Sequence, residues 1–129
     1  MSLMSFKPAG YPSLSPYLTV EEAAATLDFL KHVFGAEELR LIPGEGGKIA
    51  HAELRIDDSV VMLTEAVEGW PAVPSHVHLY VEDVDAVFAR AVAAGGKAIQ
   101  EPSQKDDGDK RGGFMDPGGT TWWVSTQMV

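Results

Sequence analysis

One internal repeat constrains this fold more than any other feature of the sequence. Residues 17–38 align without a gap with residues 78–99, which pairs Leu18 with Leu79 at an offset of 61 positions (79 − 18). In each segment an alternating apolar stretch is followed by an apolar stripe at helical spacing, with acidic residues before the stripe and glycine after it. Each segment therefore predicts a strand followed by a helix.

The repeat continues into two hairpins. The same offset aligns residues 49–65 with residues 110–126, and turn-forming residues divide each segment into two alternating runs. Further strands are expected at residues 37–42 and 97–101. Each half is thus expected to be a strand, a helix and three strands, which indicates a duplication within one domain.

The duplication predicts an α+β fold. A single domain, residues 1–129, is expected to hold two βαβββ modules at residues 10–68 and 74–127, related by a pseudo-two-fold axis. Alternation along the strands places apolar side chains on the face that carries the helices, and polar and aromatic side chains on the other face.

The polar face of the predicted sheet is rich in histidine, tyrosine and tryptophan. A plainly solvated face would carry more lysine and glutamate, so a ligand-lining groove is favoured over a solvated sheet. The predicted groove residues are Tyr17, His51, Glu53, Arg55, Met62, His76, His78, Tyr80, Phe114 and Trp123. Trp123 is expected either to stack on a ligand or to fill the groove, and His76 and His78 either bind a metal, act as acid and base, or line the groove.

Charge and composition exclude several classes of function. The net charge is −9, with only 10 lysines and arginines, which argues against nucleic acid as a partner. There are no cysteines, so disulfides and thiolate metal sites are excluded and a reducing cytoplasm is favoured. No apolar run approaches the roughly 20 residues of a membrane span and no secretory signal is recognisable, so no membrane partner is expected.

Four sequence blocks resemble the vicinal oxygen chelate superfamily, which includes glyoxalase I, extradiol dioxygenases and bleomycin resistance proteins. The blocks are PYLTVEEAAATLDFLKHVFGAEE, HAELRIDDSVVMLTE, HLYVEDVDAVFARAVAAGG and GDKRGGFMDPGGTTWW, and they look most like its PhnB-type branch. The resemblance covers residues 14–127. It implies a cupped, eight-stranded mixed sheet with the helices on its outer face, and a homodimer.

The resemblance also implies four metal-ligand positions, which fall on Ser15, Met62, His76 and Trp123. Only His76 is a good ligand, because serine binds metals poorly, the thioether of Met62 is soft and the indole of Trp123 only donates. The family's metal site is therefore expected to be dismantled, and no cofactor is expected.

Two functions fit these observations, and whether the chain is an enzyme stays open. The first is a metal-free small-molecule-binding protein of the bleomycin resistance type, for which the acidic charge and aromatic groove favour a cationic aromatic ligand. The alternative is a lyase, isomerase or dioxygenase with Zn, Ni, Fe or Mn at a rearranged site of His76, His78 and Glu53. Trp70 is expected to pack across the linker between the halves or at a dimer contact, and residues 105–113 are expected to form a mobile loop or a lid.

Overall fold

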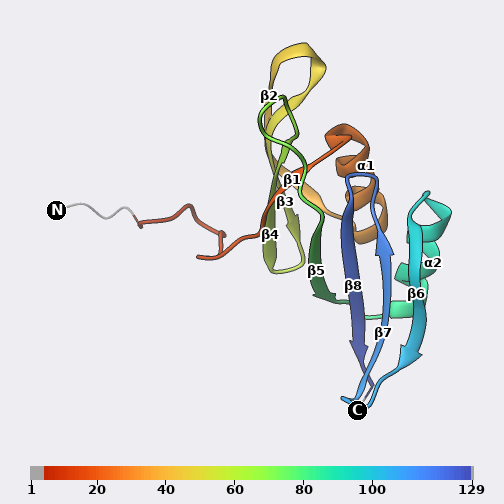
Figure 1. Ribbon diagram of the computed structural model, residues 1–129. Helices are drawn as coiled ribbons and strands as arrows, with labels where there is room; N and C mark the ends of the chain where they lie inside the picture. Colours follow the sequence, from red (N-terminus) through yellow and green to blue (C-terminus); the bar gives the residue numbers. More distant parts are fainter. Residues whose placement is uncertain (1–4, 129) are drawn as a thin grey trace.

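The computed structural model describes residues 5–128 and has the same order of elements in both halves (Figure 1). The first half contains β1 (Tyr17–Val20), α1 (Ala23–Phe34), β2 (Glu37–Pro43), the 3-10 turn η1 (Glu45–Gly47), β3 (Ile49–Ile56) and β4 (Ser59–Glu65). The second half contains β5 (Ser75–Tyr80), α2 (Val84–Ala93), β6 (Lys97–Gln104), β7 (Asp109–Met115) and β8 (Thr120–Gln127). The predicted α+β fold is confirmed. Neither helix in this part of the chain has the length and apolar character needed to cross a membrane.

The strands form two mixed sheets of four rather than one continuous ladder. Their orders are β1-β4-β3-β2 and β5-β8-β7-β6. In each sheet the first strand pairs in parallel with the last strand of its half, and the other pairs are antiparallel. The two sheets therefore have the same topology, as expected for a duplicated unit.

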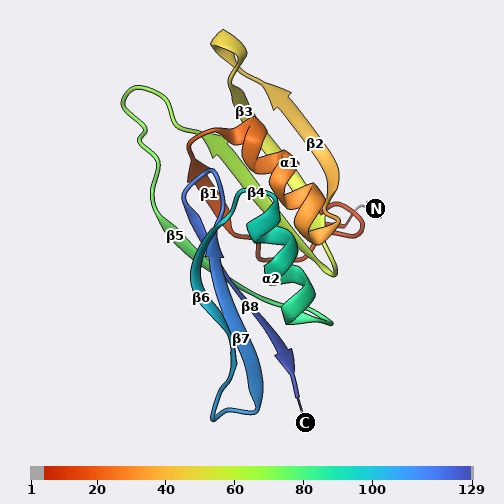
Figure 2. The same cartoon turned by 90° about the vertical axis from the view of Figure 1, so that its right-hand side faces the viewer.

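The helices of the two halves share one hydrophobic core. The ring of Phe34, at the end of α1, has its centroid 5.0 Å from that of Trp122 and 6.0 Å from that of Phe114, both in the second sheet. Arg90 of α2 donates from Nε to the carbonyl oxygen of Val33 at 2.9 Å, which ties α2 to the last turn of α1. Both helices lie on the same side of the sheets (Figure 2), so the polar faces of both sheets are directed to the other side.

The register of the two halves differs by one residue in the hairpins. Met62 of β4 pairs with Glu53 of β3, whereas its counterpart Trp123 of β8 pairs with Gly113 of β7. The offset is therefore 61 between β4 and β8 (123 − 62) but 60 between β3 and β7 (113 − 53). The turn between β7 and β8 absorbs the extra residue.

This shift moves Phe114 to the core. Phe114 pairs with Trp122, is 0% exposed, and packs against the rings of Phe29, Phe34 and Phe88. The prediction that Phe114 lines the groove is wrong, because a slip of one residue turns a side chain to the opposite face of a sheet.

A buried carboxylate holds the longer turn together. One oxygen of Asp116, Oδ1, accepts hydrogen bonds from the backbone N–H groups of Gly118 at 2.9 Å and Thr120 at 3.0 Å. The other, Oδ2, accepts from Nε1 of Trp122 at 2.9 Å, and the residue is 4% exposed. Burial raises the pKa of Asp116, while these three hydrogen bonds act to lower it.

Asp116→Ala is expected to lower the free energy of unfolding by about 2–3 kcal/mol, because three buried donors lose their acceptor. Urea unfolding followed by circular dichroism would measure the change. Asp106→Ala, at an exposed loop position, is the matched control and should leave the free energy of unfolding nearly unchanged. Equal effects of the two substitutions would contradict this role for Asp116.

Candidate functional site

The polar face of the second sheet begins with β5, where the side chains alternate as the sequence predicts. His76, His78 and Tyr80 are exposed, whereas the intervening Val77 and Leu79 pack against the core. His78 and Tyr80 touch edge to face, with ring centroids 4.8 Å apart. The strand therefore presents a row of three rings to the surface.

His76 and Trp123 form a flat pair, which we call the ring platform. The two rings are 10° from parallel, and Nε1 of Trp123 donates to Nδ1 of His76 at 3.0 Å, which joins the rings edge to edge. The indole lies directly over Gly113, where an added Cβ would come within 2.6 Å of two of its ring carbons. Glycine at position 113 thus lets the indole lie flat on the sheet.

His78 belongs to a second network on this face. Arg111 donates from Nε to Oγ of Ser125 at 2.9 Å, and His78 Nε2 lies 2.9 Å from the same oxygen. The hydroxyl of Ser125 can accept from Arg111 and still donate to or accept from His78 Nε2, because it has one proton and two lone pairs. Partial desolvation of the ring lowers the pKa of His78 and the charge of Arg111 lowers it further, so the ring is neutral at neutral pH.

Asp109, at the start of β7, and Asp107, in the loop before it, extend this network. Arg111 Nη2 donates to Asp107 Oδ2 at 2.8 Å and to Asp109 Oδ2 at 3.2 Å. Tyr80 donates to Asp109 Oδ2 at 2.8 Å, and this hydrogen bond raises the pKa of Tyr80. The prediction that residues 105–113 form a mobile loop or a lid is wrong for residues 109–113, which belong to β7, and the shorter loop before them is tied to the polar face through Asp107.

The first sheet carries a connected cluster around Glu53, which is 6% exposed. His51 Nε2 lies 2.7 Å from Glu53 Oε2, and the hydroxyl of Tyr11 donates to Glu53 Oε1 in a short hydrogen bond. The hydrogen bond from Tyr11 lowers the pKa of Glu53, and the contribution of His51 adds to this, so Glu53 is ionised at neutral pH. Tyr17 packs edge to face on His51, with ring centroids 5.6 Å apart.

Tyr11 is a residue of the site that the sequence pattern missed. It belongs to an N-terminal segment that runs out on the side of the first sheet away from α1 (Figure 1). The segment is held there by Tyr11 and by Arg55, whose Nη1 donates to the carbonyl oxygen of Gly10 at 2.8 Å. Nothing in the spacing of residues 5–16 signals this contact, because the segment forms no helix or strand.

The side chains at the four family metal positions are a poor chemical fit to the family's metal. Ser15 precedes β1, and Met62 lies in the first sheet beside Tyr17. His76 and Trp123 lie in the second sheet, and the indole N–H already occupies Nδ1 of His76. A thioether and an indole are unsuited to the hard or borderline divalent ions, so these residues do not fit the family's metal.

The rearranged set is not gathered in the described part of one chain either. Glu53 lies in the first sheet with both oxygens hydrogen-bonded, and His78 in the second sheet shares its Nε2 with Ser125. Over residues 5–128, no three side chains of histidine, aspartate or glutamate are placed to hold one metal ion.

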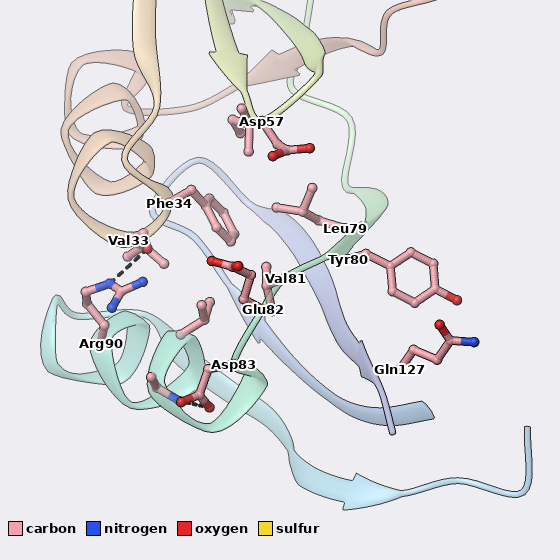
Figure 3. A pocket seen from close by; sticks show the side chains of 13 residues that line it. Val33, Phe34, Asp57, Leu79, Tyr80, Val81, Glu82, Asp83, Arg90 and Gln127 are labelled. Carbon is pink, nitrogen blue, oxygen red and sulfur yellow. Dashed lines mark hydrogen bonds between the residues drawn. The ribbon is translucent and has the colours of Figure 1, made fainter. Parts of the chain in front are cut away.

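A large open hollow lies where the two halves meet (Figure 3), with a volume of about 1030 Å³. Its walls come from the end of α1, the β3–β4 turn, the end of β5 and the first turns of α2. Phe34, Leu79, Glu82 and Asp57 are among the side chains that line it. Of the predicted groove residues only Tyr80 borders it, so this hollow is separate from the polar faces.

The fold and these polar faces agree with a sequence match over residues 13–124. The chain belongs to the Glyoxalase/Bleomycin resistance protein/Dioxygenase superfamily.

Three comparisons illustrate this membership. An uncharacterized protein of Mycobacterium bovis is 38% identical over 122 residues, which cover 86% of this chain and 80% of that protein. The crystal structure of TioX from Micromonospora sp. ML1 has 28% sequence identity and a TM-score of 0.70, covering 88% of this chain and 95% of that one. TnmS3, an antibiotic binding protein from Streptomyces sp. CB03234, has 19% identity and a TM-score of 0.70, covering 91% and 99%.

Tyr11→Phe is expected to lower the free energy of unfolding at neutral pH by about 1 kcal/mol and by less in acid. The pKa of Glu53 in the folded chain lies below its pKa in the unfolded chain. The ionised carboxylate therefore stabilises the fold at pH values above the unfolded pKa, and this stabilisation is lost as the pH falls through the folded pKa. Removing the Tyr11 hydroxyl raises the folded pKa and shrinks this contribution. Urea unfolding at neutral pH and at about pH 3 would measure both penalties.

Tyr17→Phe is the matched control, since the Tyr17 hydroxyl makes no hydrogen bond among the described residues. It should cost less than Tyr11→Phe at neutral pH. A penalty for Tyr11→Phe that is the same at both pH values would show that its hydroxyl does not act through the ionised Glu53.

Proposed function

We propose that this chain is a small-molecule-binding protein of the glyoxalase/bleomycin resistance type, which holds an aromatic ligand on its polar sheet faces without the family's metal. The observation that carries the proposal is the ring platform. The indole of Trp123 lies against Gly113 and is partly exposed, and His76 is exposed, so a flat ligand can stack on the platform. The net charge of −9 favours a cationic ligand.

The hydrogen bonds of the polar face support a binding role over metal catalysis. Glu53 is engaged by Tyr11 and His51, and His78 by Ser125. A metal-dependent lyase, isomerase or dioxygenase would have to break these bonds before Zn, Ni, Fe or Mn could use the same atoms. An ionised Glu53 with a lowered pKa is also a weak general base.

A homodimer is part of the proposal. The helices pack into the shared core, whereas the polar faces stay uncovered, with Tyr17 62% and Tyr80 61% exposed. A second copy laid over these faces would enclose a ligand between two aromatic surfaces. TnmS3, which shares this fold, is an antibiotic binding protein, and this supports a ligand of the proposed kind.

We also propose that the chain belongs to the PhnB-like branch, because the four sequence blocks resemble it. We propose a cytoplasmic location because the chain has no cysteine.

Trp123→Ala is expected to weaken binding of a planar cationic dye, acridine orange, by about 0.5–1.5 kcal/mol, because the dye loses its stacking surface. Fluorescence anisotropy of the dye would give the dissociation constants. Trp123→Phe keeps a ring at this position and should retain most of the affinity. Saturable binding that is equal in the wild type and Trp123→Ala would contradict a role for the ring platform.

Wild-type protein purified without chelator is expected to contain far less than one equivalent of Zn, Ni, Fe or Mn per chain. His76→Ala should leave this content unchanged. His76 is the one good donor among the family positions, and one donor alone does not hold a metal ion. Elemental analysis by mass spectrometry would measure both. Stoichiometric metal in the wild type that disappears in His76→Ala would favour the enzyme instead.

A further inference from the structure

A second hollow, of about 660 Å³, lies at one end of the polar face of the first sheet. Tyr17 of β1, Ile49 of β3 and Trp70 of the segment that joins the two halves contribute its walls, and we call it the Trp70 hollow. Figure 2 shows this joining segment projecting from the same end of the molecule as the β2–β3 loop. Its volume lies within the range of about 300–1,000 Å³ that is usual for small-molecule sites.

The backbone holds Trp70 in a fixed position. Trp70 N donates to the carbonyl oxygen of Val67 at 2.9 Å, and Val67 N donates back to Trp70 at 3.1 Å, which closes a tight turn. Gly69 takes a φ of 83° in this turn, a conformation that glycine adopts without strain. Ala66 N and Val73 N, on either side, donate to carbonyl oxygens of β1 at 2.8 and 3.1 Å. The indole is therefore carried by an anchored turn rather than by a loose linker.

The two aromatic walls of the hollow are largely uncovered. Trp70 is 61% exposed and Tyr17 is 62% exposed, although Tyr17 belongs to β1 and the turn that carries Trp70 is hydrogen-bonded to β1 on both sides. Neither ring contributes to the hydrophobic core. Two large rings presented at a hollow by rigid backbone gain free energy only when something covers them.

Charge at the hollow is negative on balance. Glu45 and Glu65 both line it, and Lys48 is the one cation that does. The ammonium of Lys48 donates to the carbonyl oxygen of Ala66 at 2.7 Å, which directs it to the wall. Two carboxylates and two electron-rich rings suit a positively charged ring system.

We propose that the Trp70 hollow binds the cationic end of the ligand, as a flat aromatic ring that carries a protonated amine beside Tyr17 and Trp70. This inference deepens the proposed function and rests on it. In this arrangement the carboxylates of Glu45 and Glu65 attract the positive charge of the ligand. It also makes Trp70 a binding residue rather than a linker or dimer contact.

The test uses the full chain and acridine orange as the probe. Trp70→Ala is expected to weaken dye binding roughly two- to ten-fold, the factor that the loss of one aromatic partner implies. Glu45→Gln should weaken it by roughly two- to five-fold, as for an exposed ion pair, and added salt should reduce that difference. Val73→Ala, at an exposed apolar position of the same segment outside the hollow, is the control and should bind like the wild type.

Light scattering on each variant separates a ligand site from a contact between copies. The wild type and Trp70→Ala are both expected to have twice the 13.9 kDa mass of one chain. A Trp70→Ala protein that falls to the mass of one chain would overturn the inference, because Trp70 would then be a dimer contact. So would a Trp70→Ala affinity equal to that of Val73→Ala.

The comparison with Trp123→Ala shows which proposal fails. Weakening by Trp123→Ala without weakening by Trp70→Ala would overturn this inference and leave the proposed function standing. Absence of saturable dye binding to the wild type would overturn both. Weakening by Trp70→Ala and Glu45→Gln, with Val73→Ala unchanged, is the result that supports the inference.

Discussion

The packing of Phe34 against Phe114 and Trp122 decides how this molecule is arranged. Phe34 belongs to the first half and the other two rings to the second, so burying the ring at the end of α1 requires the second sheet to lie beside it. Because α1 and α2 pack in one core, the faces of the sheets that carry the helices are buried within the chain. The remaining faces can then acquire polar and aromatic side chains without loss of the core.

The polar faces are ordered by hydrogen bonds rather than by burial of apolar surface. Among the described residues, no buried side-chain nitrogen or oxygen lacks a partner. Glu53, Arg111 and Ser125 each contact two or more neighbours, so their positions are fixed before any ligand arrives. Such preorganisation reduces the conformational entropy lost on binding. It also leaves few free acceptors for a metal among the side chains described, in line with the organic ligand proposed above.

The sequence predicts the order of the elements well because the duplication repeats every element at nearly the same spacing. It predicts the polar face of β5, where strict alternation determines the direction of each side chain. It fails at Phe114, because the longer turn that holds Asp116 changes the register by one residue, and turn length is not visible in an ungapped alignment.

The sequence misses Tyr11 and leaves the position of Trp70 undecided for a different reason. Both lie outside helices and long strands, so no periodicity gives the direction of their side chains. The position of Tyr11 depends on Glu53, 42 residues away, and that of Trp70 depends on a turn anchored to β1. Contacts of this kind are set by tertiary structure and become visible only in the folded chain.

The edge-to-edge contact between Trp123 and His76 has a consequence for selectivity. The one N–H of the indole is used within the plane of the pair, so the open side of the platform offers a π surface and no directed donor from that ring. Gly113 closes the other side. If the proposed ligand stacks here, molecular shape would decide which compounds bind: thin, flat compounds of varied substitution pattern would fit and puckered ones would not. Chemically diverse planar compounds would thus compete for one place.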